Sequence, residues 1–443
     1  MPNVWGEQLP ALAKEGSLPA LNRSATRPAM SSRQVLSPVE MQYPHGVITE
    51  PAVKVKVMNC IRFRRRSGSL AAVAILTGLI VLAGFGRPAA TAEPLPKQLE
   101  DAAFWQMVNE FSEKGGSFGS ENFVSNESNF QLVLTELTAA AKPGAAYLGV
   151  GPEQNFTYIA ALQPSIAFII DIRRQNLILH LMYKAIFEMA PDRATFLSIL
   201  FSRRSPQGLS ENFTIRELLS AYKAVPADLE LAITNRQAIK DILVNRHGFP
   251  LSTNDVSTLE HIHHVFELYG PDTAYASNLG SADSTNRPAN GSFTMVLTTG
   301  DKDGVNRSFL SSEDLFHVVK DMEQRNLIVP VVGDFGGEKA LRRIAQYLKD
   351  QKVVVSAFYL SNVEQYLFQN NPLARNGGSY RFYENVATLP VDSSSMFIRS
   401  TNRIARRQVY PGFTSHLASI AETLHVFKEQ GLHSIRDVLA LSR

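Results

Sequence analysis

The stretch 147-YLGVGPEQNFTYIAALQPSIAFIIDIRRQN-176 decides the fold that we predict for this chain. The run 147–151 is apolar and ends in glycine, as a strand entering a tight turn does. A helix is predicted after it, and a second apolar run, 166–170, ends in Asp171. The order strand, glycine turn, helix, strand and acid is typical of the first crossover unit of a parallel sheet.

The rest of the chain repeats this alternation. Apolar runs of strand length are separated by segments with helical spacing of apolar residues, which favours crossover units and a mostly parallel sheet. We expect strands at 293–299, 327–335, 352–362 and 395–400, and helices at 97–113, 125–137, 175–190, 193–202, 214–223, 227–246, 255–269, 311–325, 338–351 and 414–431.

The segment of about 175–292 is mainly helical and separates Asp171 from the next acid that ends a strand, Asp334. One crossover needs a dozen or more residues, and this stretch is far longer. We therefore predict one α/β domain over 93–443 with a large helical insertion that covers the strand ends.

Composition narrows the class of protein. The chain has 443 residues, of which 44% are hydrophobic and 19% charged, so it can bury a sizeable core. The net charge is +3, and we find no basic face that would indicate a nucleic-acid partner. The single cysteine, Cys60, excludes a disulfide framework and a cysteine-based zinc site.

The N-terminal part reads as a targeting segment. A basic cluster at 62–66 precedes the uncharged apolar run 70–86, and Ala90 and Ala92 follow in an A-x-A pattern. This layout predicts either a cleaved signal peptide within 58–92 or, if it is retained, a membrane anchor. Residues 1–57 read as disordered, and translation starts either at Met1 or at Met58. Either way, the domain from about residue 93 is expected to be exported or to lie outside the cytoplasmic membrane.

The turn after the first strand predicts a ligand site. Gly149 and Gly151 let the backbone approach a nucleotide, and Asp171, about 20 residues further on, is placed for ribose hydroxyls. The dinucleotide pattern G-x-G-x-x-G is not met because position 154 is Gln154, and Glu153 would repel a pyrophosphate. A small molecule without phosphates suits this turn better.

The motifs resemble the class I S-adenosylmethionine-dependent methyltransferases. 147-YLGVGPEQN-155 resembles their glycine-rich motif, 168-FIIDIR-173 their acidic second strand, 331-VVGDFGG-337 their third, and 358-FYLSNVEQYL-367 their fourth. Together with the tripeptide SNE at 125–127, they resemble a bacterial family of unassigned function with a methyltransferase-like core. The resemblance implies a three-layer Rossmann-like sheet and S-adenosylmethionine as cofactor. Asp171 would then hold the ribose, Asp334 the adenine amine, and Phe335 would stack on the ring.

Alternative interpretations accompany each feature. Gly149 and Gly151 could serve only a tight turn, Asp171 could cap a helix beside Arg173, and Asp334 could belong to simple turn chemistry. His261 and His264 share a helical face, but nothing completes a metal site, so we interpret them as helix surface. No residue is assigned a catalytic role. The alternative to methyl transfer is a non-catalytic exported protein, binding or structural, that kept the fold.

Overall fold

The structure, a computed structural model, describes residues 95–210, 212–275, 291–369, 377–401 and 412–443. The expectations for 1–57, for 58–92 and for the apolar run 70–86 lie outside these residues. Among the residues described, no helix is both long and apolar enough to cross a membrane.

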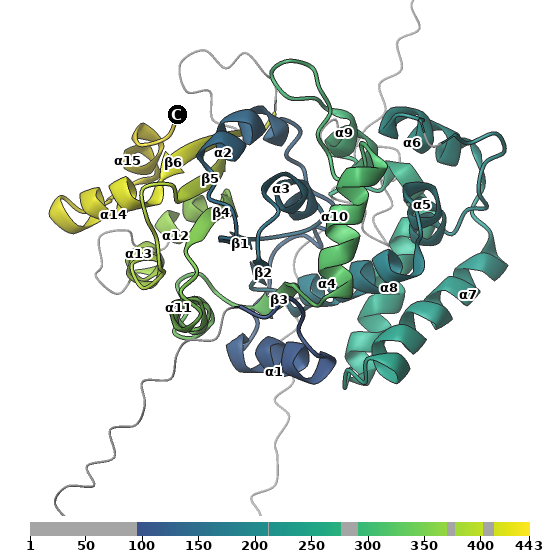
Figure 1. The fold of residues 1–443 in the computed structure, drawn as a ribbon, viewed down its shortest axis with the longest axis horizontal. Helices are drawn as coiled ribbons and strands as arrows, with labels where there is room; N and C mark the ends of the chain where they lie inside the picture. Colours follow the sequence, from purple (N-terminus) through teal and green to yellow (C-terminus); the bar gives the residue numbers. More distant parts are fainter. Residues whose placement is uncertain (1–94, 211, 276–290, 370–376, 402–411) are drawn as a thin grey trace, which may run out of the picture. The chain divides into compact units, whose positions relative to one another are not determined.

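A six-stranded sheet forms the centre of the fold (Figure 1). Its order is β3-β2-β1-β4-β5-β6; the first five strands are parallel and β6 runs antiparallel to β5. This confirms the predicted α/β class with a mostly parallel sheet. The strands are β1 (Ala146–Gly149), β2 (Ile166–Asp171), β3 (Ile328–Val332), β4 (Val355–Ser361), β5 (Met396–Thr401) and β6 (Thr414–Ser419).

Helices cover both faces of the sheet. Helices α2, α3, α4 and α10 lie on one face, and α1, α11 and α13 on the other (Figure 1). The strands between them are buried on both faces, which explains why β1 and β2 consist of continuous apolar runs. These helices are α1 (Asp101–Phe111), α2 (Leu134–Ala140), α3 (Gln154–Leu162), α4 (Arg174–Met189), α10 (Glu313–Gln324), α11 (Ala340–Asp350) and α13 (Gly378–Val386).

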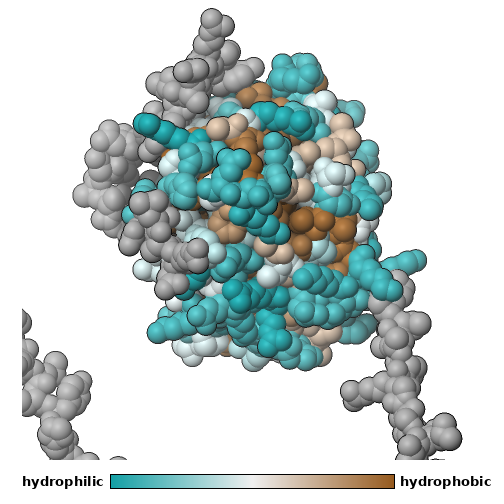
Figure 2. Space-filling view, turned by 90° about the vertical axis from the view of Figure 1, so that its left-hand side faces the viewer, coloured by the Kyte–Doolittle hydropathy of each residue, from teal (hydrophilic) through white to brown (hydrophobic). Residues whose placement is uncertain are grey.

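Further helices lie between β2 and β3 and at the C-terminal end. The first group packs beside α4, on the right of Figure 1, and makes up most of the long crossover. It comprises α5 (Arg193–Phe201), α6 (Ile215–Ala224), α7 (Leu229–Lys240), a π-helix (Asp241–Arg246), α8 (Thr253–Tyr269) and α9 (Phe293–Thr298); the second comprises α12 (Val363–Gln369), α14 (Ile420–Glu429) and α15 (Ile435–Ala440). The side with α11, α13 and α14 is mostly hydrophilic, with smaller apolar areas between (Figure 2).

Two predicted elements are wrong. The segment 293–299 is helix α9, not a strand, because Phe293, Val296 and Leu297 bury one helical face and Ser292 accepts a hydrogen bond from the Met295 N–H. The start of the predicted helix 414–431 is strand β6, which pairs with β5 along its whole length; the helix begins only at Ile420, capped by Ser419.

A third prediction is shifted. The helix expected to begin at 125 or 126 begins at Phe130, as a 3-10 turn (Phe130–Val133) that leads into α2. Residues 125–127 come before it, without helical structure, and their side chains bond to α3 and β4 instead. This displacement brings the SNE tripeptide to the ends of the parallel strands.

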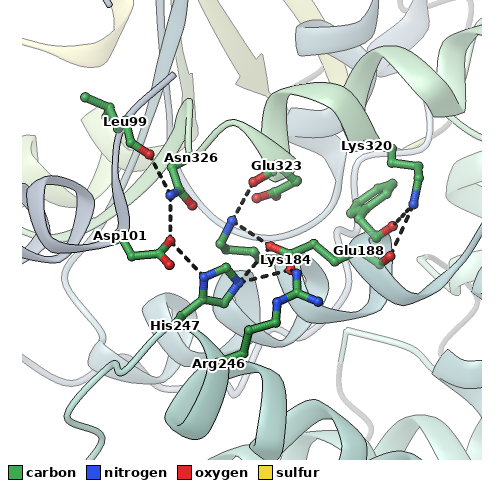
Figure 3. A network of polar contacts seen from close by, with 10 residues as sticks. Leu99, Asp101, Lys184, Glu188, Arg246, His247, Lys320, Glu323 and Asn326 are labelled. Atoms are coloured by element: carbon green, nitrogen blue, oxygen red, sulfur yellow. Dashed lines mark hydrogen bonds and ion pairs between the residues drawn. The ribbon is translucent and has the colours of Figure 1, made fainter. Parts of the chain in front are cut away.

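A buried network of charges lies near the amino-terminal end of β3 (Figure 3). Lys184 of α4 is 1% exposed, and its Nζ lies 2.9 Å from Glu188 Oε1 and donates to the Glu323 carbonyl. His247 bridges Glu188 and Asp101, at 3.0 and 2.8 Å, and Arg246 also pairs with Glu188. The network therefore ties α1, α4, α10 and the π-helix together.

Protonation in this network follows from the pairing. Burial would raise the pKa of Glu188, but hydrogen bonds from His247 and Lys184 together hold that pKa below its ordinary value. Glu323 is different: burial raises the pKa of its carboxyl to about 8, and its Oε1 has no hydrogen-bond partner among the residues described. Glu323 is therefore a neutral acid at the edge of a charged cluster.

Candidate functional site

A cavity of about 420 Å³ lies at the carboxyl ends of the parallel strands. From β1, the chain adds β2 and β3 on one side and β4 and β5 on the other, so the strand order reverses between β1 and β4. Ligands of open α/β sheets bind in the crevice at such a switch point. Residues after β1, β2, β3 and β4 line the cavity, and so does the segment before α2.

The glycine turn is held by Asn155. Its Nδ2 donates to the carbonyls of Val150, Gly151 and Pro152 at 2.7–3.2 Å, and its Oδ1 accepts from the Tyr147 hydroxyl at 2.9 Å. A Cβ on Gly149 would lie 1.9 Å from that Oδ1, so glycine is needed there for packing. Gly149 is not among the cavity-lining residues, whereas Gly151, with φ +78°, is.

His180 of α4 also contacts this turn. Its Nε2 lies 2.8 Å from the Gly151 carbonyl oxygen, so this nitrogen carries the proton and donates it. Burial lowers the pKa of His180 to about 4, which leaves the ring neutral at physiological pH. The turn is therefore fixed by neutral groups.

Asp171 lines the cavity but is paired with Arg173. Arg173 Nε donates to Asp171 Oδ1 at 2.9 Å and Nη2 to Oδ2 at 2.7 Å, and the Arg173 backbone N–H donates to Oδ1 at 2.9 Å. Both side chains are buried. The structure thus contains the Arg173 pair that the alternative interpretation of Asp171 expects. One lone pair of Oδ2 remains for a ligand.

Asp334 and Phe335 line the cavity from the loop after β3. Asp334 Oδ1 accepts a hydrogen bond from the Gly336 N–H at 2.8 Å, the turn contact of the alternative interpretation. Glu113 holds the loop by accepting from the Asp334 N–H at 2.9 Å and the Lys339 N–H at 3.3 Å. Phe335 stacks on Phe382 with a centroid distance of 5.6 Å.

Glu127, the acid of the SNE tripeptide, is a cavity residue that sequence reasoning did not select. It is 2% exposed and accepts hydrogen bonds from Ser361 Oγ at 2.5 Å and Gln154 Nε2 at 3.1 Å. Burial raises its pKa, and those hydrogen bonds act in the opposite direction. The sequence does carry a signal for this residue, because SNE is one of the motifs behind the resemblance, but its pattern alone predicts a helix start.

Aromatic side chains line the cavity beside these carboxyls. Phe118 and Tyr366 are 38% and 42% exposed and meet edge to face at 5.4 Å. The Arg173 guanidinium lies 5.8 Å from the Phe118 ring centroid. Exposed rings of this kind can contact a planar ligand group with little rearrangement.

The two histidines singled out on α8 lie apart from this cavity. His261 Nε2 is 2.7 Å from Glu121 Oε1, and His264 Nδ1 is 3.0 Å from Glu267 Oε2. Neither is among the lining residues. Within the described ranges, no group of three or more His, Cys, Asp or Glu side chains is placed to hold a metal ion.

The comparisons with known proteins give one family. A domain of unknown function, DUF7790, matches residues 122–221 and 267–438, which is more than half of the chain. A search of curated proteins finds no match. The matched segments contain Glu127, Gly151, Asp171, Asp334 and Ser361, and the unmatched stretch between them contains α7, the π-helix and most of α8. The chain therefore belongs to the DUF7790 family.

Proposed function

We propose that this protein binds S-adenosylmethionine in the switch-point cavity and transfers its methyl group to an acceptor. The observation that carries the proposal is the convergence of Gly151, Asp171, Asp334 and Phe335, selected from three separate motifs, on one cavity. In this proposal Asp171 accepts from the ribose, Asp334 from the adenine amine, and Phe335 lies against the ring. When bound, the cofactor supplies a methyl group on a sulfonium, and no residue is assigned to the transfer itself.

The charges around the cavity fit a nucleoside without phosphates. Among the described lining residues Arg173 is the only cation, and its guanidinium is committed to Asp171. Phosphate sites present free cations and backbone N–H groups. The N–H groups of Asp334 and Lys339 already donate to Glu113. The volume of about 420 Å³ falls in the range of about 300–1,000 Å³ that is usual for small-molecule sites.

Titration calorimetry of the full-length protein with S-adenosylmethionine and S-adenosylhomocysteine tests the proposal. Asp334→Asn should weaken binding by about tenfold, because a hydrogen bond to a charged group is worth ~1.5–3 kcal/mol. Asp171→Asn should weaken it as well. His264→Ala is the matched control, since His264 does not line the cavity, and its affinity should stay within about twofold. The absence of heat at millimolar ligand would refute the proposal.

A second candidate is a non-catalytic exported protein that binds a ligand with the same cavity. The Asp171–Arg173 pair favours it, because most of the hydrogen-bonding capacity of this carboxylate is already used. Export is proposed from the segment 62–86. A periplasm-only reporter fused after residue 100 should give signal, and deletion of 62–86 should abolish it. Signal from a cytoplasm-only reporter at the same position would contradict export.

A further inference from the structure

We infer that Glu127 recognises a positively charged group of the ligand and forms a cation subsite at the β4 side of the cavity. This inference rests on the proposed function and names the part of the ligand that the carboxyl selects. It starts from an asymmetry among three carboxyls that line one cavity: Asp171, Asp334 and Glu127.

The first step is that Glu127 lacks a protein cation. Asp171 is neutralised by Arg173, and Asp334 is partly exposed, at the surface loop after β3. Glu127 is buried, and no lysine or arginine pairs with it in the part of the chain that the structure describes. Buried carboxylates are normally paired or shift their pKa. A buried acid at a cavity wall therefore has a place for a cation that the fold does not supply.

The second step is the surroundings of the carboxyl. Ser361 and Gln154 donate hydrogen bonds to it from β4 and α3, and thereby fix its orientation. The ring of Tyr359 lines the cavity beside it and packs on Tyr158 with a centroid distance of 5.2 Å. A carboxyl and an aromatic ring side by side are a combination that can bind an organic cation. A hydrated metal ion would not need the ring of Tyr359, so the pair favours an organic cation.

The third step is position along the sheet. Asp334 follows β3, Asp171 ends β2, and Glu127 bonds to Ser361 at the end of β4. With adenine and ribose at the first two carboxyls, the remainder of S-adenosylmethionine lies toward the third. That remainder carries the sulfonium and the ammonium group. Asn126 and Asn362 line the same cavity, and their amides can donate hydrogen bonds to the carboxylate of S-adenosylmethionine.

Proton linkage gives an independent readout. Burial raises the pKa of Glu127, and a bound cation favours the ionised form, so binding releases a proton and tightens as pH rises. The titratable groups that face Glu127 are the phenols of Tyr147 from β1, Tyr158 from α3 and Tyr359 from β4. Burial raises the pKa of all three phenols, so they stay neutral at any pH at which a carboxyl titrates.

The experiment titrates the full-length protein with three nucleosides by calorimetry. S-adenosylmethionine carries both cations, S-adenosylhomocysteine carries the ammonium alone, and 5′-methylthioadenosine carries neither. The wild type should bind S-adenosylmethionine at least about tenfold more tightly than 5′-methylthioadenosine. Glu127→Gln should remove about that factor for S-adenosylmethionine and leave 5′-methylthioadenosine within about twofold. An equal loss for S-adenosylhomocysteine identifies the ammonium as the bound cation, and a smaller loss identifies the sulfonium.

Glu323→Gln is the matched control, because Glu323 is also a buried acid with a raised pKa but does not line the cavity. It should leave all three affinities unchanged. If Glu127→Gln fails to fold, the wild-type series decides: equal affinity for the charged and uncharged nucleosides overturns the subsite. Unchanged S-adenosylmethionine binding by a folded Glu127→Gln protein also overturns it. Binding of none of the three refutes the proposed function, and this inference with it.

Discussion

Two buried clusters of carboxyl groups lie at opposite ends of the same sheet, and they differ in what neutralises them. Near the amino-terminal end of β3, Lys184, His247 and Arg246 surround Glu188 (Figure 3). At the carboxyl ends of the strands, Glu127 is held by a hydroxyl and an amide. The first cluster is complete without a ligand and connects helices. In the second, Glu127 has no lysine or arginine partner among the residues described, and we propose that a cation of the ligand takes that place.

The largest expected effect is on the first cluster. Lys184→Ala removes a cation that is 1% exposed, and with it the ion pair to Glu188 and the hydrogen bond to the Glu323 backbone carbonyl. Breaking a buried pair costs about 3–5 kcal/mol, because an uncompensated charge remains. Urea unfolding should show this loss of the free energy of unfolding. A loss below about 1 kcal/mol would mean that His247 and Arg246 alone neutralise Glu188.

The next effect depends on pH. The pKa of Glu323 is about 8 in the folded protein, above its ordinary value, so its contribution to stability is present at low pH and is lost as pH rises through about 8. Glu323→Gln removes this loss. The free energy of unfolding of the variant, relative to that of the wild type, should therefore rise by roughly 1–3 kcal/mol between pH 5 and pH 8.5. Urea unfolding at the two pH values checks this. If the stability of Glu323→Gln differs from that of the wild type by the same amount at both, the raised pKa is contradicted.

A smaller effect is expected at the second cluster. Ser361→Ala removes a donor that holds the Glu127 pKa down, and it should cost about 1 kcal/mol of stability. The pH at which S-adenosylmethionine binding strengthens should move upward, since the carboxyl ionises less readily. Calorimetry at several pH values gives the profile. A profile equal to that of the wild type would show that Glu127 does not control binding.

The smallest effect belongs to a surface pair. Lys142 and Asp392 lie 3.4 Å apart, and their side chains are 57% and 34% exposed. Exposed pairs contribute about 0–1 kcal/mol. Lys142→Ala should therefore change the free energy of unfolding by less than about 0.5 kcal/mol, which makes it the reference for Lys184→Ala. A cost near that of Lys184→Ala would show that burial does not separate the two pairs.

Much of the sheet could be predicted from the sequence because β1, β2 and β3 are short, mainly apolar runs that end at or just before a glycine or an acid. The segment 293–299 shows the limit: its apolar residues fit both a period of two and a helical spacing, and only the buried face chooses between them. In 414–419, small and polar residues hide an edge strand whose partner, β5, decides the outcome.

The candidate site was predicted in part for a related reason. Asp171 and Asp334 end strands, and parallel strands place their ends together, so pattern alone brings them to one edge. Glu127 precedes the sheet in the chain and reaches the cavity only through bonds to Gln154 and Ser361, 27 and 234 residues away. Contacts of such separation leave no periodic signal in a single sequence.

The backbone around the cavity has a consequence for how the protein could be engineered. Asn122 and Ser361 line the cavity with φ of +52° and +51°, a conformation that costs residues other than glycine about 1 kcal/mol or more. The chain thus forgoes stability at two positions to keep an amide and a hydroxyl beside the ligand space. Glycine at position 122 should raise the melting temperature and lower ligand affinity. At position 361 the relief of backbone strain is offset by loss of the hydrogen bond that Ser361 donates to buried Glu127.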